Sequence, residues 1–240
     1  MSAQNQTPHN QTPQNQTPQN QTTVWGKSQK AALAGLVLVQ SAAAYFIGAG
    51  HWLTNDGHYL VAPIAGTAAF PVLLFLAAYA LSTRFRGFVL SQDIRTLTMM
   101  QHWRVVGFVF LPLYAFGVLP GLFAWPAGLG DVAIGLAAVL VVARLDRDSN
   151  YAKTSGFLWF HFLGLSDFAV AIATSGLAAG AFPELISNGA TSAPLDVWPL
   201  NVFPSFIVPA FIILHLTVLL KVRELRRSAR RRVSASLQTA

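Results

Sequence analysis

The chain has 240 residues, of which 53% are hydrophobic and only 10% are charged. Ordinary soluble domains carry nearer 25% charged residues, so this composition excludes that class. The absence of cysteine also excludes disulfides, thiolate metal sites and thiol catalysis.

The N-terminal segment is built from polar pentads, QNQTP and close variants of it, over residues 4–23. With no apolar side chain to bury, such a segment cannot offset the entropy lost on ordering. The sequence therefore predicts a disordered tail over residues 1–26. It is followed by a transmembrane domain over residues 27–221 and a basic cytoplasmic tail over residues 222–240.

Long apolar runs follow the tail, and a helix of about 20 apolar residues is enough to cross the hydrocarbon core of a bilayer. The predicted spans are Ala31–Gly50, Tyr59–Ser82, Val105–Ala124, Ala127–Ala143, Ser155–Ala178 and Asn201–Leu220. The expected fold class is an all-α integral membrane protein with six transmembrane helices.

The 16 Lys and Arg residues give a net charge of +7, and their positions follow the predicted topology. They fall before the first span, in residues 84–104, in residues 144–153 and in residues 221–232, whereas the intervening connections contain none. Cytoplasmic loops carry such an excess of basic residues, so both termini are predicted to be cytoplasmic in a multi-pass protein of the cell inner (plasma) membrane. The basic charge is thus a topology signal, and no nucleic-acid partner is predicted.

The expected partners are membrane lipids, including anionic headgroups at the basic tail. The chain could form a homo-oligomer or a hetero-oligomer, and the sequence does not decide between these two alternatives. Gln40, near the middle of the first span, is expected to face a partner helix. Residues 90–104 fit an amphipathic helix lying on the cytoplasmic interface, which would leave Arg104 near that surface at the start of the third span.

Two related segments place an aspartate inside an apolar run: GLGDVAIGLA at 128–137, with Asp131, and GLSDFAVAIA at 164–173, with Asp167. In each segment small residues share one helix face with the aspartate, which predicts close approach of the two helices. Asp131 is expected one to two turns below the outer surface and Asp167 near the bilayer centre. Because no basic residue is expected at the depth of Asp167, a protonated carboxyl group is favoured over a salt bridge.

Two histidines, His161 and His215, are expected at similar depth in the fifth and sixth spans. One hypothesis is that they share a haem iron or a metal ion. The alternative is a pair of hydrogen-bonded packing histidines. The prediction includes neither a metal site nor a cofactor.

The GLGD sequence at Gly128–Asp131 resembles the GxGD motif of intramembrane aspartyl proteases of the signal-peptide-peptidase and presenilin type, and Pro209-Ala210-Phe211 is similar to their PAL motif. The resemblance implies a second catalytic aspartate in a Tyr-Asp pair on the preceding span, where this chain has Tyr114-Ala115. Asp167 would have to substitute from another helix. No catalytic residue is therefore assigned, and the chain is not predicted to be an enzyme.

The leading functional hypothesis is a small transporter or a proton-coupled membrane subunit that uses the carboxyl groups of Asp131 and Asp167. The alternatives are an inactive relative of the GxGD proteases, a haem-binding membrane protein and a structural or assembly protein of the membrane.

Overall fold

A computed structural model describes residues 26–55, 63–180, 182 and 189–238 of the chain. The regular structure in these ranges is entirely helical, which confirms the predicted all-α class. The tail predicted to be disordered lies outside the described residues, apart from Gly26.

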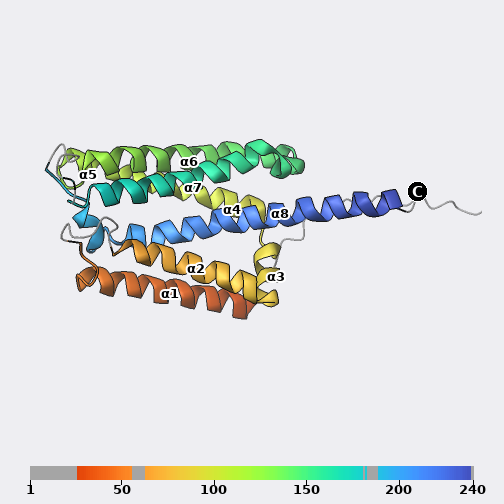
Figure 1. The fold of residues 1–240 in the computed structure, drawn as a ribbon, viewed down its shortest axis with the longest axis horizontal. Coiled ribbons are helices and arrows are strands. Elements are labelled where there is room, and N and C mark those ends of the chain that lie inside the picture. Colours follow the sequence, from red (N-terminus) through yellow and green to blue (C-terminus); the bar gives the residue numbers. More distant parts are fainter. Residues whose placement is uncertain (1–25, 56–62, 181, 183–188, 239–240) are drawn as a thin grey trace, which may run out of the picture.

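The helices follow one another in the order shown in Figure 1, where α denotes α-helices and η denotes 3-10 helices, except η5, which is a π-helix. They are α1 (Lys27–Ala49), α2 (Ala65–Leu81), α3 (Thr83–Ser91), α4 (Ile94–Met100), η1 (Gln101–Val109), α5 (Phe110–Ala115), α6 (Gly121–Arg147), η2 (Ser149–Lys153), α7 (Ser155–Leu177), η4 (Ala193–Asp196), η5 (Phe203–Ile207) and α8 (Val208–Gln238).

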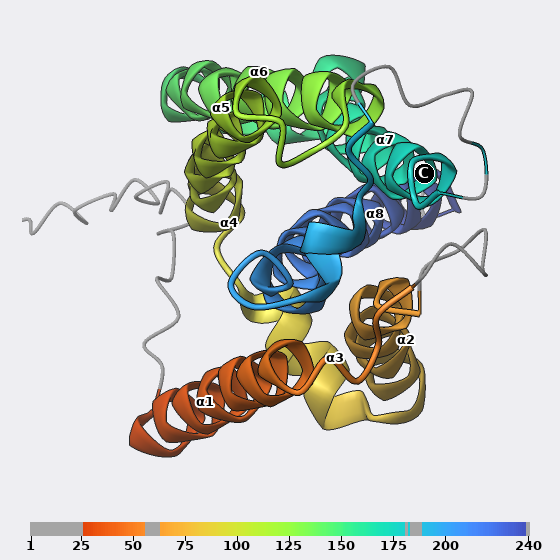
Figure 2. The same ribbon diagram turned by 90° about the vertical axis from the view of Figure 1, so that its left-hand side faces the viewer.

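The long helices lie side by side, and Figures 1 and 2 show that they run along one common direction. The start of α1, the bend between α2 and α3, the turn between α6 and α7, and the end of α8 all lie at one end of the molecule. We call this the basic end, because these elements carry the basic segments of the sequence. The other end, called the opposite end, holds the connections from α1 to α2, from α5 to α6 and from α7 to α8.

The number of membrane spans differs from the predicted six. Within the described residues, Gly121–Arg147, Ser155–Leu177 and Phe203–Arg231 are long and apolar enough to cross a membrane. A fourth span results if α2 and α3, which are bent by 110° relative to each other, are counted together. The described part of the chain thus holds three, or up to four, helices suited to span a membrane, as expected for a multi-pass membrane protein.

Two of the other predicted spans lie in α1 and in the residues from η1 to α6. Helix α1 has 23 residues, and its fully described apolar part, Ala34–Ala49, is a shorter apolar helix. The predicted third span, Val105–Ala124, does not form one α-helix, because its residues are divided among η1, α5, a turn and the start of α6. A count of apolar residues detects neither a change of helix type nor a break.

The α4–η1–α5 run also corrects the position of Arg104. Asp93 caps α4 by accepting a hydrogen bond from the Thr96 backbone N–H at 2.7 Å, and the helical path then continues into η1 without a turn. Residues 90–104 therefore do not form a separate interfacial helix. Arg104 lies ten residues beyond the start of α4, which corresponds to roughly 15–20 Å at the rise of α- and 3-10 helices.

Helix α6 begins earlier than predicted, and this places Asp131 deeper. The helix starts at Gly121 after Pro120, so that Pro126 lies inside it rather than at its first turn. Asp131 is therefore about 15 Å along α6 at 1.5 Å per residue. Helix α6 starts at the opposite end and α4 starts at the basic end. Asp131 and Arg104 each lie ten residues beyond these starts, so both are near the middle of the molecule.

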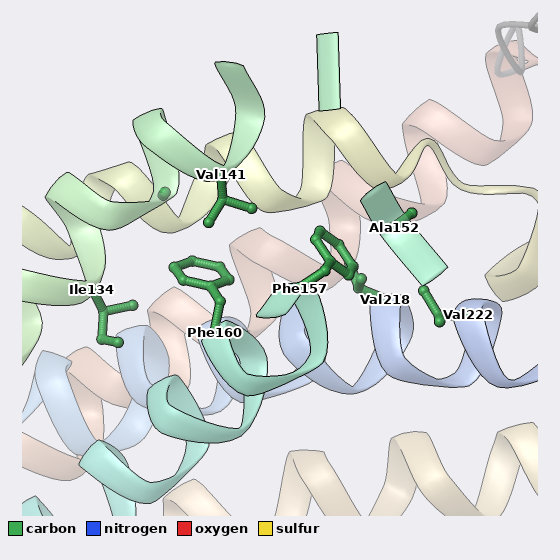
Figure 3. Packing of buried hydrophobic residues seen from close by; sticks show 8 residues of the cluster. Ile134, Val141, Ala152, Phe157, Phe160, Val218 and Val222 are labelled. Atoms are coloured by element: carbon green, nitrogen blue, oxygen red, sulfur yellow. The ribbon is translucent and has the colours of Figure 1, made fainter. Parts of the chain in front are cut away.

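Two clusters of buried apolar side chains lie on either side of this middle layer. The first, called the inner cluster, packs α6, α7 and α8 together toward the basic end and includes Ile134, Val141, Ala152, Phe157, Phe160, Val218 and Val222 (Figure 3). The second, called the outer cluster, lies toward the opposite end and comprises Phe110, Leu119, Phe123, Ala124, Ala127 and Leu195. The polar residues of the candidate site lie between these two clusters.

Helix α1 is attached to the bundle by amide side chains. Gln40 donates a hydrogen bond to the Ser205 carbonyl in η5, at 2.5 Å, which places it against a partner helix as predicted. Asn201 donates to the Ala44 carbonyl at 2.6 Å.

The residues predicted to form a basic tail continue the last helix, since α8 extends to Gln238.

Candidate functional site

The centre of the site is the guanidinium group of Arg104, whose side chain is completely buried. Its Nε donates to Asp131 Oδ1 of α6 at 2.8 Å, and its Nη2 donates to Asp167 Oδ2 of α7 in a second, short ion pair. The two carboxyl side chains are 15% and 13% exposed, respectively, so they are the more accessible members of the cluster.

The third nitrogen of Arg104 is also in use. Nη1 donates to the Gly164 carbonyl at 3.0 Å and lies 3.4 Å from His215 Nε2 of α8. The guanidinium carbon lies 3.9 Å from the centre of the Phe168 ring, within the range of a cation–π interaction. Arg104 thus joins η1 to α6, α7 and α8.

The contact with Arg104 fixes the protonation pattern of two histidines. Arginine has only donors, so His215 Nε2 must act as the acceptor in this contact. The proton of neutral His215 then resides on Nδ1, which donates to His161 Nδ1 at 2.8 Å. The proton of neutral His161 must consequently lie on Nε2, an atom that is buried and has no hydrogen-bond partner among the described residues.

Glycines provide the space that the charged groups occupy. A Cβ added at Gly107 in η1 would overlap the carboxyl group of Asp131, and one at Gly130 in α6 would overlap that of Asp167. A Cβ at Gly164 would overlap the ring of His215. These three positions explain why small residues accompany the aspartates.

The small-residue faces meet different partners from those predicted. A Cβ at Gly128 would lie 3.1 Å from Leu111, and one at Gly135 would lie 2.9 Å from Val105. That face of α6 therefore packs on η1 and α5 rather than on the matching face of α7. Close contact between α6 and α7 is made at Gly130, a neighbouring position.

A cavity reaches the two carboxylates. It is bordered by Asp131, Asp167 and Arg104 at one side, and its walls extend toward the opposite end of the molecule. The volume of the cavity is about 70 Å³. The wall residues are mostly apolar and include Ala68, Phe110, Phe123, Ala171, Ile172, Ser175, Ser192, Phe203 and Phe211.

The structure brings together five of the six polar residues singled out in the sequence: Arg104, Asp131, Asp167, His161 and His215. Gln40 lies apart, at the α1–η5 contact. The prediction that no basic residue reaches the depth of Asp167 is wrong, because Arg104 forms an ion pair with it. The cause is the longer helical run before Arg104.

One pattern in the sequence could have revealed the position of Arg104. Thr98, Gln101, Arg104 and Gly107 recur at intervals of three, the period of a 3-10 helix, and all four are buried. Trp103 and Phe108 on the same run are 71% and 58% exposed. Polar residues facing inward and apolar residues facing outward are typical of a membrane helix, in which ionisable residues face the bundle interior.

The histidine geometry does not suit a shared haem or metal ion. The direct hydrogen bond between the two Nδ1 atoms leaves no room for an iron atom between the rings. Among the described residues, no group of three or more His, Cys, Asp or Glu side chains is arranged to hold a metal ion.

A family model described as a domain of unknown function (DUF8737) matches residues 61–223, which is more than half of the chain. The match includes Arg104, Asp131, Asp167, His161 and His215. No curated protein and no solved structure matches the chain.

Proposed function

For this chain, which belongs to the DUF8737 family of unknown function, we propose that the Arg104–Asp131–Asp167 cluster takes up and releases a proton. The proton would pass through the cavity, and the protein would act as a small transporter or as a proton-coupled subunit of the membrane.

The observation that carries this proposal is the charge balance of the cluster. Two carboxylates, Asp131 and Asp167, pair with the single guanidinium of Arg104. When both are ionised, one negative charge remains in excess in a largely dehydrated site, where uncompensated charge is costly. Binding one proton makes the cluster neutral.

The proton acceptor in this scheme must be a carboxylate. Arginine does not lose its proton in proteins, so Arg104 acts as a fixed positive charge that holds both aspartates in place. Asp131 and Asp167 line the cavity and are partly exposed, whereas the side chain of Arg104 is completely buried. A proton delivered by water in the cavity therefore meets the carboxylates first.

The one-sided access to the cluster supports a transport role. The cavity extends toward the opposite end of the molecule, and the inner cluster, which includes Phe157 and Phe160, lies between the site and the basic end. A site near the middle of the bundle that is reached from one side is expected for a carrier with alternating access.

Infrared difference spectroscopy between pH 5 and pH 9 tests the proposal, because only a protonated carboxyl group has the corresponding carbonyl stretch. The wild-type protein should show this band for one buried carboxyl group. Asp131→Asn and Asp167→Asn should each remove it, since each leaves one carboxylate to balance Arg104. Asp146→Asn is the matched control, because its carboxylate is exposed and pairs with Arg95 at the surface.

The result that would contradict the proposal is a wild-type protein without the band, or a band that survives both buried variants. In that case a purely structural role of the ion pairs would be the better account.

The protease hypothesis receives less support from the geometry. The resemblance to the GxGD proteases implies a second catalytic aspartate on the span before Asp131, whereas Asp167 lies on α7, after it. Here Arg104 forms ion pairs with both Asp131 and Asp167. We therefore propose a non-enzymatic function.

A further inference from the structure

The charge that faces the cavity is negative, because its wall holds Asp131, Asp167 and a third carboxylate, Asp196, which accepts a hydrogen bond from the Asn55 backbone N–H at 2.9 Å. Every nitrogen of the Arg104 guanidinium already has an acceptor or an ion-pair partner, and its side chain has no exposed surface. An anion entering the cavity would therefore find no accessible donor on Arg104. The carboxyl groups of Asp131 and Asp167 do retain exposed surface, so the accessible side of the cluster favours a cation.

The walls above the carboxylates suit an apolar body. The rings of Phe110, Phe123 and Phe203 form a cluster at the cavity, with centroids 5.0 Å apart for Phe110–Phe123 and 4.6 Å apart for Phe110–Phe203. Aromatic rings attract cations as well as apolar groups. A mostly apolar wall with a few convergent polar groups is the usual composition of a small-molecule site.

The size of the cavity sets an upper limit on the ligand. A single water needs about 10–15 Å³ measured at its centre, so the 70 Å³ available would hold a few waters. A ligand of one small ring with a short charged arm fits this space better than a large drug-like molecule.

From these three observations we infer that the cavity binds a small organic cation, namely an amine with an apolar body, whose ammonium group contacts Asp131 and Asp167. This inference rests on the proposed function, because it assigns a substrate class to the same carboxylates.

Proton and amine should compete for the site. Each neutralises the same excess negative charge, and binding both would leave an uncompensated positive charge beside Arg104. One proton would therefore leave as one ammonium ion binds, with charge conserved. This coupling is that of an exchanger for protons and organic cations.

The experiment is calorimetric titration of the purified full chain with three probes of nearly equal size: benzylammonium, neutral benzyl alcohol and anionic benzoate. Benzylammonium alone should bind measurably at pH 8, and its affinity should fall at least about tenfold at pH 5. Repeating the titration in buffers with different ionisation enthalpies counts the protons released, and about one is expected over the pH range of the infrared band.

Two kinds of variant locate the site. Asp131→Asn and Asp167→Asn should each lower the affinity for benzylammonium at least about tenfold, whereas Asp146→Asn should leave it unchanged. Ser175→Leu adds bulk to the cavity wall eight residues beyond Asp167 on α7, which is about 12 Å along the helix. It should weaken amine binding while the infrared band of the buried carboxyl group persists, even if an aspartate variant fails to fold.

The outcomes separate this inference from the proposed function. If the infrared band is present but benzylammonium does not bind, the assigned ligand class is wrong and the proton site stands. Equal binding of benzyl alcohol would also overturn the inference, because it would mean that the apolar walls alone select the ligand. Loss of both the band and the binding would overturn both proposals.

Discussion

At the scale of single residues, the site depends on a charged side chain that has no contact with solvent. Arg104 is held by two carboxylates, a backbone carbonyl and an imidazole. Burying a charge is tolerated only when it is paired and its hydrogen bonds are made, and these partners meet both requirements. The glycines that face the cluster are therefore part of its geometry.

Gly130→Ala tests this role of the glycines. The added methyl group would overlap Asp167 Oδ1, so the carboxylate or the helix must shift. We expect a loss of about 1–3 kcal/mol in the free energy of unfolding, as is usual for overpacking. The measurement is unfolding of the purified protein in detergent, followed by circular dichroism.

The matched control is Gly66→Ala near the start of α2, where an added Cβ meets nothing within 4 Å. This variant should be as stable as the wild type or slightly more stable, because alanine is the better helix former. Equal effects of the two substitutions would contradict the account of Gly130.

The residues of the site were partly predictable from the sequence. Asp131, Asp167, His161 and His215 attract attention because polar residues are rare in apolar runs. The role of Arg104 was missed, since its depth depends on where the helical run before it begins. That start is set by the Asp93 cap and by the continuation of α4 into η1.

At the scale of elements, α1 differs from the other long helices in how it is held. The contacts between helices place α1 against η5, and the polar bonds of Gln40 and Asn201 link the two regions. Gly48 allows this approach, because a Cβ there would overlap the amide of Asn201. Among the described residues, the attachment combines these polar groups with a ring contact between Tyr45 and Trp198.

Asn201→Ala should loosen α1 from the bundle. The substitution removes the hydrogen bond from the Asn201 amide to the Ala44 carbonyl, and such a bond contributes about 0.5–1.5 kcal/mol. Thermal unfolding in detergent measures the loss. Asn150→Ala, which removes an exposed amide in η2, is the control and should leave stability unchanged.

A similar loss in Asn150→Ala and Asn201→Ala would mean that the bond to α1 contributes nothing specific. The sequence predicted a polar attachment for Gln40 only, because Asn201 lies at the edge of an apolar run, where a polar residue is unremarkable.

At the scale of the whole molecule, the described chain begins and ends at the same end, which is also where the basic segments gather (Figure 1). This arrangement agrees with the pattern of basic residues that predicted a cytoplasmic location for both termini. The side of the membrane on which this end lies remains a prediction.

Cysteine labelling tests that orientation, and the natural absence of cysteine makes single substitutions easy to interpret. Ser149→Cys lies in the turn between α6 and α7 at the basic end, whereas Thr54→Cys lies in the connection after α1 at the opposite end. A membrane-impermeant maleimide applied to intact cells should label Thr54→Cys and spare Ser149→Cys. The reverse pattern would place the basic end outside.

The number of spans shows where sequence reasoning stops. Apolar composition predicted six crossings, but within the described residues three or four helices qualify. Composition measures how well a segment suits lipid, and it does not reveal that α2 and α3 are bent by 110° or that the 94–115 run changes helix type.

The central claim is that one buried arginine pairs with two partly exposed carboxylates that together bind one proton, and the unfolding free energy of charge-matched variants tests the pairing most directly. Arg104→Met should lose about 3–5 kcal/mol, because it leaves both carboxylates without their cationic partner. Adding Asp131→Asn and Asp167→Asn should recover most of that loss, since the site is again neutral. A triple variant no more stable than Arg104→Met alone would contradict the account.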